Sequence, residues 1–527
     1  MKTSIFKILA FSSMIAIFSF ANAQEKSVTD KIIEIGKSNN KTMHHLDVLS
    51  NRIGGRVLGS DAYENATYWA AGLFKQWGLE VEIQEAGELP VGFNRGPWFG
   101  RMLSEDGMSL HFATPSYTSG TKGIQRGHVV AEPKTKAEFE RMKGKLKGAW
   151  VLVTGENEGW PIDYSEYADT LRSQIIQENL KISKYNDSIG RINRENENKP
   201  ENKNKPQIAK KELKDAPALF YKEMKDAGIL GIIQSSTVPI RALYDRKNIE
   251  YMTWDELPTC PDIKLDENQY KIIAQKVKER QYFQLEFDIR NHFKPGPVKY
   301  HNVIGIIRGT EFPDEYVMSG GHLDAFDVAT GGVDCGTGVA PNLEAARMIM
   351  AAGGKPRRSI AFCLWAGEEF GLWGSKFWVE SHKDMLDKIS NYFNRDGGPT
   401  IANSLSVPPA MFEDFKKATE QLNTINPDFP FTLTVRQEAR PKPTTAGGSD
   451  HAHFAINGVP TISFGTADPK GYDFNYGEIW HTERDTYNMS IPEYMEHTST
   501  VMAVVLYNLA NQNKMLSRKG LYICHPN

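Results

Sequence analysis

Apolar and polar residues follow two different periods along this chain, one typical of helices and one typical of strands. Residues 60–78 read SDAYENATYWAAGLFKQWG, with apolar positions at helical spacing, Ser60 or Asp61 as a cap and a glycine at the end. Beyond residue 300, strand-like apolar runs occur in NVIGIIRG, YVMSGGHLD, SIAFCLWAG and VPTISFGTA, separated by helical patterns such as NLEAARMIMAAG. This alternation predicts an α/β domain.

The middle of the chain has a different pattern. Short strand-like runs such as GHVVAE and GAWVLVTG lie among helices there. We therefore expect one α/β domain built from residues 24–99 and 291–527, interrupted by an inserted, mainly β domain over residues 100–290. Within the insert, residues 165–215 are rich in Asn, Lys, Glu and Gln, which predicts an exposed helical excursion with a mobile tip near 195–206.

The first residues predict export. Lys2 and Lys7 precede an apolar run that ends in Ala-Asn-Ala, which is typical of a secretory signal peptide, here residues 1–23 with cleavage after Ala23. An uncleaved membrane anchor is the alternative, and the shortness of the apolar run disfavours it. No later stretch reaches about 18 uninterrupted apolar residues, so we expect a periplasmic or extracellular protein without a membrane span in its mature form.

Net charge and cysteine content argue against two classes of protein. The formal net charge is −3, which offers no polycationic surface for nucleic acid. The four cysteines are scattered, so we expect no disulfide scaffold, although a Cys260–Cys524 bridge stays open.

Potential metal donors follow several of the predicted strands. Ligands of α/β sheets collect beyond the carboxyl ends of strands, which is where these side chains fall. The set is His322, Asp324, Asp334, Glu368, Glu369, Asp396 and His481. Nitrogen and oxygen donors of this kind suit divalent cations, with zinc the first choice. Two zinc ions need a shared anionic ligand, and the glycines of GGVDCGTG would let the backbone approach closely enough to supply one.

Each of these residues also has an ordinary interpretation. A His-x-Asp pair can be a surface hydrogen bond, and Glu368 and Glu369 can stabilise a helix start. Asp396 before two glycines can form a turn, and His481 can lie in an ordinary loop. The position of every donor at a strand end or in the loop beyond it favours the metal site.

The chain resembles the di-zinc exopeptidases, a family that includes aminopeptidases and glutamate carboxypeptidases, and its layout is most similar to that of carboxypeptidase Q. The motifs that carry the resemblance are GGHLDAFD, GGVDCGTGVAPNLEAAR, LWAGEEFGLWGS, NRDGG, GGSDHAHFAINGVP and WHTERDT. The upstream RIGGRVLGSDAYENATYWAAGLFKQWGL is similar to the N-terminal segment of the family, and the insert resembles a protease-associated domain. The implied fold is a mixed-sheet, phosphorylase/hydrolase-like catalytic domain.

The resemblance implies a role for each donor. Asp334 would bridge two Zn²⁺ ions, His322 and Asp396 would complete one site, and Glu369 and His481 the other. Glu368 would be the general base for a metal-bridged water, and Asp324 would hydrogen-bond the far nitrogen of His322.

Two further features concern the surroundings of this site. The family often has a second aspartate after the bridging one, and this chain has Cys335, which we interpret as a packing residue rather than a soft ligand. Ser449, Asp450 and His451 are candidate substrate contacts, with a structural turn as the equal alternative.

We therefore expect a zinc metallopeptidase that removes terminal residues from peptides or dipeptides, from either end. A glutaminyl cyclase-like acyl transferase and a non-catalytic, receptor-like protein are the alternatives. A homodimer is compatible with the inserted domain.

Overall fold

The computed structural model describes residues 26–104, 107–155, 157–162, 166–197, 206–214, 218–244 and 246–523. The expected signal peptide, Cys524 and most of the predicted mobile tip lie outside these residues. Among the described residues, no helix is both long and apolar enough to cross a membrane.

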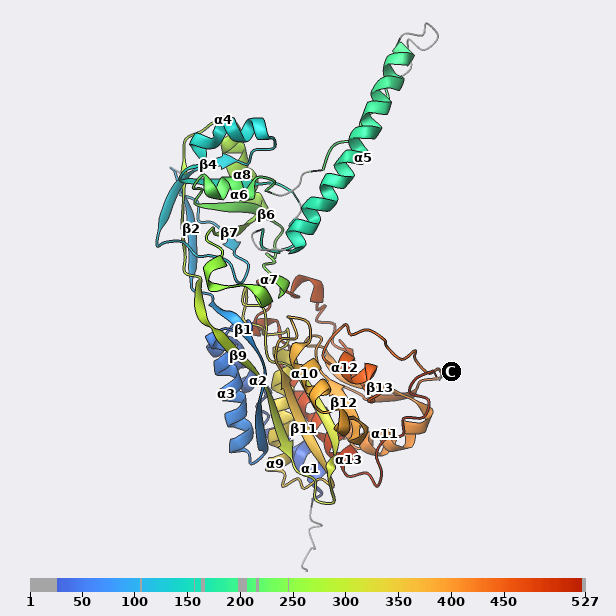
Figure 1. Ribbon diagram of the computed structural model, residues 1–527. Helices are drawn as coiled ribbons and strands as arrows, with labels where there is room; N and C mark the ends of the chain where they lie inside the picture. Colours follow the sequence, from blue (N-terminus) through green and yellow to red (C-terminus); the bar gives the residue numbers. More distant parts are fainter. Residues whose placement is uncertain are drawn as a thin grey trace, which may run out of the picture.

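A five-stranded mixed sheet forms the centre of the larger unit (Figure 1). Its inner strand β10 runs parallel to both neighbours, β11 and β12, while β9 pairs antiparallel with β11 and with the edge strand β1. In sheet order the strands are β1 (Glu80–Asn94), β9 (His292–Ile307), β11 (Arg358–Trp365), β10 (Phe312–His322) and β12 (Ile389–Asn394). Because β10, β11 and β12 are parallel, their carboxyl ends meet at one edge of the sheet.

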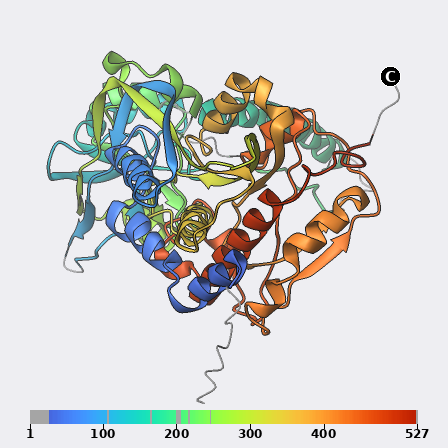
Figure 2. The same cartoon turned by 90° about the horizontal axis from the view of Figure 1, so that it is seen from below.

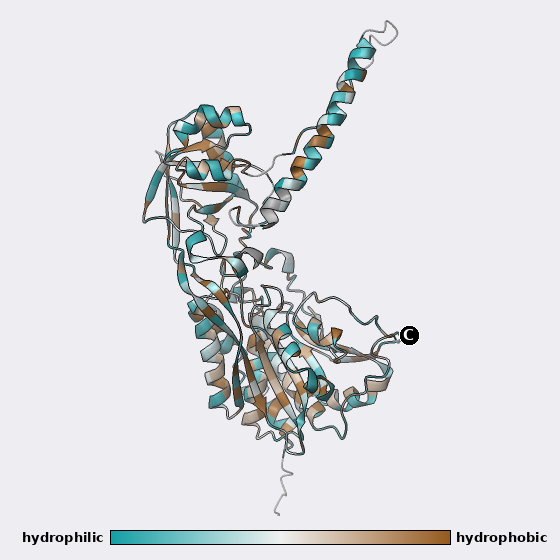
Figure 3. Cartoon of the chain, in the orientation of Figure 1, coloured by the Kyte–Doolittle hydropathy of each residue, from teal (hydrophilic) through white to brown (hydrophobic). Residues whose placement is uncertain are grey.

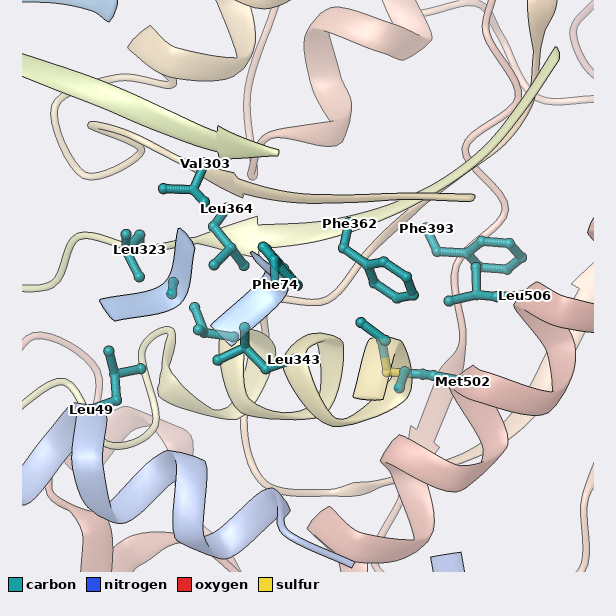
Figure 4. Close-up of a cluster of buried hydrophobic side chains, with 14 of the residues drawn as sticks. Leu49, Phe74, Val303, Leu323, Leu343, Phe362, Leu364, Phe393, Met502 and Leu506 are labelled. Atoms are coloured by element: carbon teal, nitrogen blue, oxygen red, sulfur yellow. The ribbon is translucent and has the colours of Figure 1, made fainter. Parts of the chain in front are cut away.

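Helices cover both faces of this sheet. The helices α3 (Asp61–Gln76), α9 (Gly336–Ala351) and α13 (Pro492–Ala510) enclose the main core, and α10 (Trp373–Ser381) and α12 (His451–Ile456) adjoin a smaller cluster. Figure 4 shows Leu343 and Met502 packed beneath Phe362 of the sheet. Seen from below, the N-terminal helix α1 (Val28–Ser38) lies beside α13 (Figure 2), where Thr29 donates to Asn508 at 2.8 Å.

The structure confirms the predicted capped helix and corrects one predicted strand. The Ser60 side chain accepts from the backbone N–H of Tyr63 at the start of α3. In VPTISFGTA, only β15 (Gly465–Ala467) is a strand, in a small sheet with β13 (Ile401–Val407) and β14 (Thr432–Val435). The side chain of Asn391 in β12 hydrogen-bonds both the N–H and the C=O of Ile462. These side-chain bonds take the place of the backbone hydrogen bonds that a neighbouring strand would make at Ile462.

The inserted region contains a seven-stranded sheet in the order β2-β8-β4-β5-β6-β7-β3. Its strands are β2 (Trp98–Leu103), β8 (Gln284–Ile289), β4 (Gln125–Ala131), β5 (Ala149–Val153), β6 (Gly231–Ser236), β7 (Asp262–Asp266) and β3 (Phe112–Ala113). The region also holds α4 (Lys136–Leu146), α6 (Tyr221–Asp226), α7 (Arg246–Tyr251) and α8 (Glu267–Lys278), so it contains more helix than the sequence pattern predicts. Its domain boundaries and its likeness to a protease-associated domain stay predictions.

The two units are joined by a long antiparallel pair. Strands β1 and β9 pair from Glu80↔Ile306 in the central sheet to Asn94↔His292 near the inserted region (Figure 1). Tyr244 of the insert returns to the main core, where its ring stacks on Phe370 with centroids 4.1 Å apart.

A single helix, α5 (Glu166–Glu197), projects from the inserted region (Figure 1), with polar and apolar residues mixed along it (Figure 3). Three asparagines spaced seven residues apart attach the returning segment 206–214 to it. The side chain of each hydrogen-bonds both the N–H and the C=O of one residue, in the pairs Asn179 with Lys214, Asn186 with Lys211 and Asn193 with Ile208. Seven helical residues rise about 10.5 Å and three extended residues about 10 Å, so the two repeats stay in register.

Replacing Asn186 with alanine is expected to detach the middle of the returning segment. Two hydrogen bonds to the backbone of Lys211 are lost, at about 1 kcal/mol each, without any change in the central core. Hydrogen exchange at Lys211 should accelerate while the melting temperature stays constant. The exposed neighbour Asp187→Ala is the control, and unchanged exchange at Lys211 in Asn186→Ala would contradict the pairing.

Candidate metal centre

The predicted donors lie together at the carboxyl edge of the central sheet. His322 is the last residue of β10, Glu369 follows β11 by four residues, and Asp396 follows β12 by two. Asp334 precedes α9, and His481 lies in the loop before α13. The sheet aligns the ends of β10, β11 and β12, and two loops bring Asp334 and His481 to the same place.

Asp334 lies between the two histidines. Its Oδ1 is 3.1 Å from Nε2 of His322, and its Oδ2 is 3.5 Å from Nε2 of His481. His322 Nε2 is also 3.6 Å from Oδ1 of Asp396, and His481 Nε2 is 3.0 Å from Oε2 of Glu369. The five residues thus form two groups of donors that share one carboxylate.

The burial and chemistry of these groups fit bound cations. The five side chains are at most 15% exposed, and Oε1 of Glu369 is buried without a hydrogen-bond partner among the described residues. One ligand atom each from His322, Asp334 and Glu369 lies within 4.8 Å of the others. Uncompensated buried carboxylates are costly, whereas two divalent ions would neutralise them. The assignment of each residue as a ligand stays a prediction.

The pKa values of the site are strongly shifted in the absence of cations. Burial raises the pKa of Glu368 to about 10, and the neighbouring charges of Glu369 and Asp450 act in the same direction. Burial lowers the pKa of His481 to about 4, so its imidazole is neutral at pH 7 and has a free lone pair for a metal.

Zinc binding is expected to release protons at neutral pH. Burial raises the pKa of Glu368 to about 10, and burial and Asp334 raise the pKa of Glu369 well above its usual value, so the metal-free site carries protons at pH 7 that bound cations would displace. The apparent zinc affinity should therefore increase with pH. Titration calorimetry at pH 7 in two buffers of different ionisation enthalpy measures the number released, and a value of zero would contradict this description of the site.

Asp324 supports the site through its carboxylate. Its two oxygens accept the backbone N–H groups of Glu368 and Glu369 at 3.1 and 3.2 Å, which fixes the turn after β11. Nδ1 of His322 is 2.9 Å from the backbone oxygen of Asp324 and 3.7 Å from its carboxylate. The nearer partner of the ring is therefore the backbone, and the carboxylate also holds the acidic turn.

Two buried residues that the sequence reading did not single out hold the loop that carries Asp334. The Arg56 guanidinium donates to the carbonyl oxygens of Leu323, Gly54, Thr330 and Gly331. From the opposite end of the chain, Oδ1 of Asp485 accepts the N–H groups of Val333 and Asp334 at 2.6 and 3.2 Å. Both residues lie within motifs that carry the resemblance, RIGGR and WHTERDT, but their burial shows only in the fold.

Cys335 lies close to the centre and is fully buried. Its Sγ and one possible ligand atom each of His322 and Asp396 lie within 4.8 Å of one another. The thiol donates a hydrogen bond to the carbonyl oxygen of Arg395 at 3.3 Å. Burial raises the pKa of the thiol to about 12. The carbonyl partner of the thiol supports the interpretation of Cys335 as a packing residue, which stays a prediction.

Replacing Cys335 with alanine is expected to leave zinc content unchanged and to lower thermal stability modestly. The loss of one buried sulfur atom costs about 1–2 kcal/mol. Elemental analysis and a thermal melt check this, with Cys363→Ala, another buried cysteine, as the control. Loss of zinc from Cys335→Ala alone would show that the sulfur is a ligand.

The predicted substrate loop adjoins the same carboxylates. Ser449 accepts a hydrogen bond from Nδ2 of Asn394 at 2.9 Å and donates to Asp396, which contributes to lowering the pKa of that carboxyl. Asp450 is fully buried, and burial raises its pKa to about 7. His451 is half-buried. Burial lowers its pKa, and the negative charge of Asp396 acts in the opposite direction. Ser449 and Asp450 thus contribute to the wall of the centre, while contact of the loop with a substrate stays a prediction.

A mixed α/β sheet with a paired histidine and carboxylate centre at its carboxyl edge is the arrangement expected of a metallopeptidase. Residues 302–506 match the model of Peptidase family M28. This segment contains all the predicted metal donors, and the resemblance predicted from the motifs is confirmed.

Related sequences carry carboxypeptidase names. The chain is 33% identical over 230 residues to a probable glutamate carboxypeptidase of Arabidopsis thaliana, which covers 41% of this chain and 32% of that protein. It is 29% identical over 219 residues to carboxypeptidase Q of Mus musculus, covering 41% of this chain and 43% of that protein. The chain therefore spans less than half the length of these relatives.

Solved structures extend the likeness in fold to almost the whole chain. A Peptidase M28 precursor of Shewanella amazonensis aligns with a TM-score of 0.54 at 19% identity, covering 93% of this chain and 97% of that one. The zinc aminopeptidase BSAP of Bacillus subtilis aligns with a TM-score of 0.51 at 17% identity, covering 92% and 97%. The predicted mixed α/β fold is confirmed.

Proposed function

We propose that this protein is a zinc-dependent exopeptidase, exported from the cell, that hydrolyses the terminal bonds of peptides or dipeptides. The observation that carries the proposal is the position of Asp334 between His322 and His481, each with a second carboxylate beside it. Shared carboxylates of this kind allow two cations to approach within about 3.5–4 Å. The names of the relatives support the substrate class.

The residues of the chain would divide the chemistry between them. When bound, two zinc ions would polarise the scissile carbonyl and lower the pKa of water. His322 and Asp396 would hold one ion, Glu369 and His481 the other, with Asp334 shared. Glu368, whose backbone is fixed by Asp324, would accept a proton from the attacking water and pass it to the leaving amine.

Blocked dipeptides test the proposal and decide the end that is cleaved. The purified mature protein is incubated with free, N-blocked and C-blocked dipeptides, with and without a chelator. Hydrolysis that requires a free amine indicates an aminopeptidase or dipeptidase, and hydrolysis of N-blocked substrates indicates a carboxypeptidase. Activity that survives verified metal removal would overturn the proposed mechanism.

The two alternatives predict different measurements. A glutaminyl cyclase-like acyl transferase would saturate with one zinc ion per chain and would cyclise substrates without hydrolysis. A receptor-like protein would bind peptides without turnover. The two complete donor groups around Asp334 support the hydrolase over both.

A further inference from the structure

A small cavity lies behind the loop that carries Ser449 and His451. It has a volume of about 240 Å³ and lies between the segment 436–447, helix α12 and the residues near 521. Part of its lining is apolar, contributed by Ala452, Ala455, Ile462 and Leu521. Arg436 and Arg440 also line it.

Among the described residues that line this cavity, no side chain compensates its positive charge. None of the described lining residues is acidic. Arg436 donates from Nη2 to the backbone oxygen of Leu521 at 3.2 Å, but its Nε is buried without a hydrogen-bond partner among the described residues. Burial and the charge of Arg440 both lower the pKa of Arg436. An anion in the cavity would supply the missing partner and relieve the repulsion between the two guanidinium groups.

The lining and volume define the anion. A guanidinium group binds a carboxylate through two parallel hydrogen bonds, and the apolar lining suits a small apolar side chain. Pockets for drug-sized ligands measure about 300–1,000 Å³, so a cavity slightly below that range suits a ligand the size of one amino-acid residue. We infer that this cavity binds a carboxylate-bearing amino-acid residue, either the carboxyl-terminal residue of a peptide or a free amino acid.

The place of the cavity connects it with the candidate metal centre. His451 lines the cavity, and the charge of Asp396 acts on the same imidazole. Ser449, two residues earlier, hydrogen-bonds Asp396. One short loop therefore contacts both places. As a substrate subsite the cavity rests on the proposed exopeptidase function, whereas carboxylate binding itself does not depend on catalysis.

Calorimetry with a matched pair of probes tests the binding. N-acetyl-L-alanine carries the carboxylate, and N-acetyl-L-alanine amide has the same shape without the charge. Loss of one charged hydrogen-bonding partner, as in Arg436→Gln or Arg440→Gln, should weaken binding of the acid about tenfold or more. The amide should bind equally weakly to every variant. Lys417→Gln removes an exposed cation elsewhere on the same domain and should change nothing.

The outcomes separate the inference from its rivals. Equal binding of acid and amide, unchanged binding in Arg440→Gln, or no binding at millimolar concentration would overturn it. Arg440 is exposed, so its variant is expected to fold, which a thermal melt checks, and Arg440→Lys should restore part of the affinity.

Kinetics then distinguish the two sources of the carboxylate. For a substrate terminus, Arg440→Gln raises KM for free-carboxylate peptides and leaves kcat and the KM of peptide amides unchanged. For a free amino acid, peptide kinetics stay constant and only the response to added N-acetyl-L-alanine is lost. A protein without hydrolytic activity that still binds the acid would refute the proposed function and keep the site.

Discussion

Replacing Glu368 with glutamine is expected to lower kcat by about 10²–10⁴-fold while the zinc content and the fold stay unchanged. Glutamine keeps the size of the side chain and the backbone N–H that Asp324 accepts, but it cannot take a proton from water. Burial and the neighbouring Glu369 and Asp450 raise the pKa of Glu368 in the metal-free protein. Bound cations would lower this pKa and favour the ionised form that a general base needs. The measurement is kcat on the preferred dipeptide, together with zinc analysis of the same sample.

Glu413→Gln, an exposed change on helix α11 (Phe412–Thr419), is the matched control and should keep full activity. If Glu368→Gln retained wild-type kcat with full zinc content, Glu368 would not be the general base. Loss of zinc from the variant would instead indicate that Glu368 is a ligand.

Replacing Asp334 with asparagine is expected to have the largest effect on metal binding. Mutation of a residue that supports a metal ligand typically lowers metal affinity by about 10–100-fold. Loss of a carboxylate that is itself shared by two ions should lower the affinity by more than that. Asparagine retains the shape of the side chain but removes the negative charge between His322 and His481. We expect loss of at least one zinc ion per chain and of measurable hydrolysis, determined by elemental analysis after dialysis at a fixed zinc concentration.

Asp384→Asn, an exposed change in the same domain, is the control for the loss of one carboxylate. Full retention of both ions in Asp334→Asn would contradict the shared-ligand arrangement. A thermal melt in the presence of chelator separates a metal effect from misfolding. Without metal, the wild-type protein and Asp334→Asn should melt at similar temperatures.

The sequence predicted the elements that carry the candidate site because their patterns are local. The capped helix α3 depends on Ser60 and its own first turn, and the strands before His322 and Glu369 are continuous apolar runs. Parallel strands align their carboxyl ends, so donors that follow strands were expected to converge. The structure brings the strand-end donors His322, Glu369 and Asp396 together as that reasoning required, and Asp334 and His481 reach them from loops.

The features that the sequence did not predict depend on contacts between distant segments. Arg56 and Asp485 are 429 positions apart and both hydrogen-bond the backbone of the loop that carries Asp334. No periodic pattern in the sequence predicts a contact between segments so far apart. Asn391 takes the place of a strand partner for Ile462, so an apolar run that looked like a full strand is not one. The asparagine repeat of α5 binds the backbone of the returning segment 206–214, a contact that the spacing of the asparagines alone does not predict.

The central claim is that these donors hold two zinc ions around Asp334, and anomalous diffraction at the zinc absorption edge tests it most directly. The account predicts two peaks per chain about 3.5–4 Å apart, one beside His322 and Asp396, the other beside Glu369 and His481, with Asp334 touching both. A single peak, or zinc bound away from Asp334 in crystals grown with saturating zinc, would contradict it.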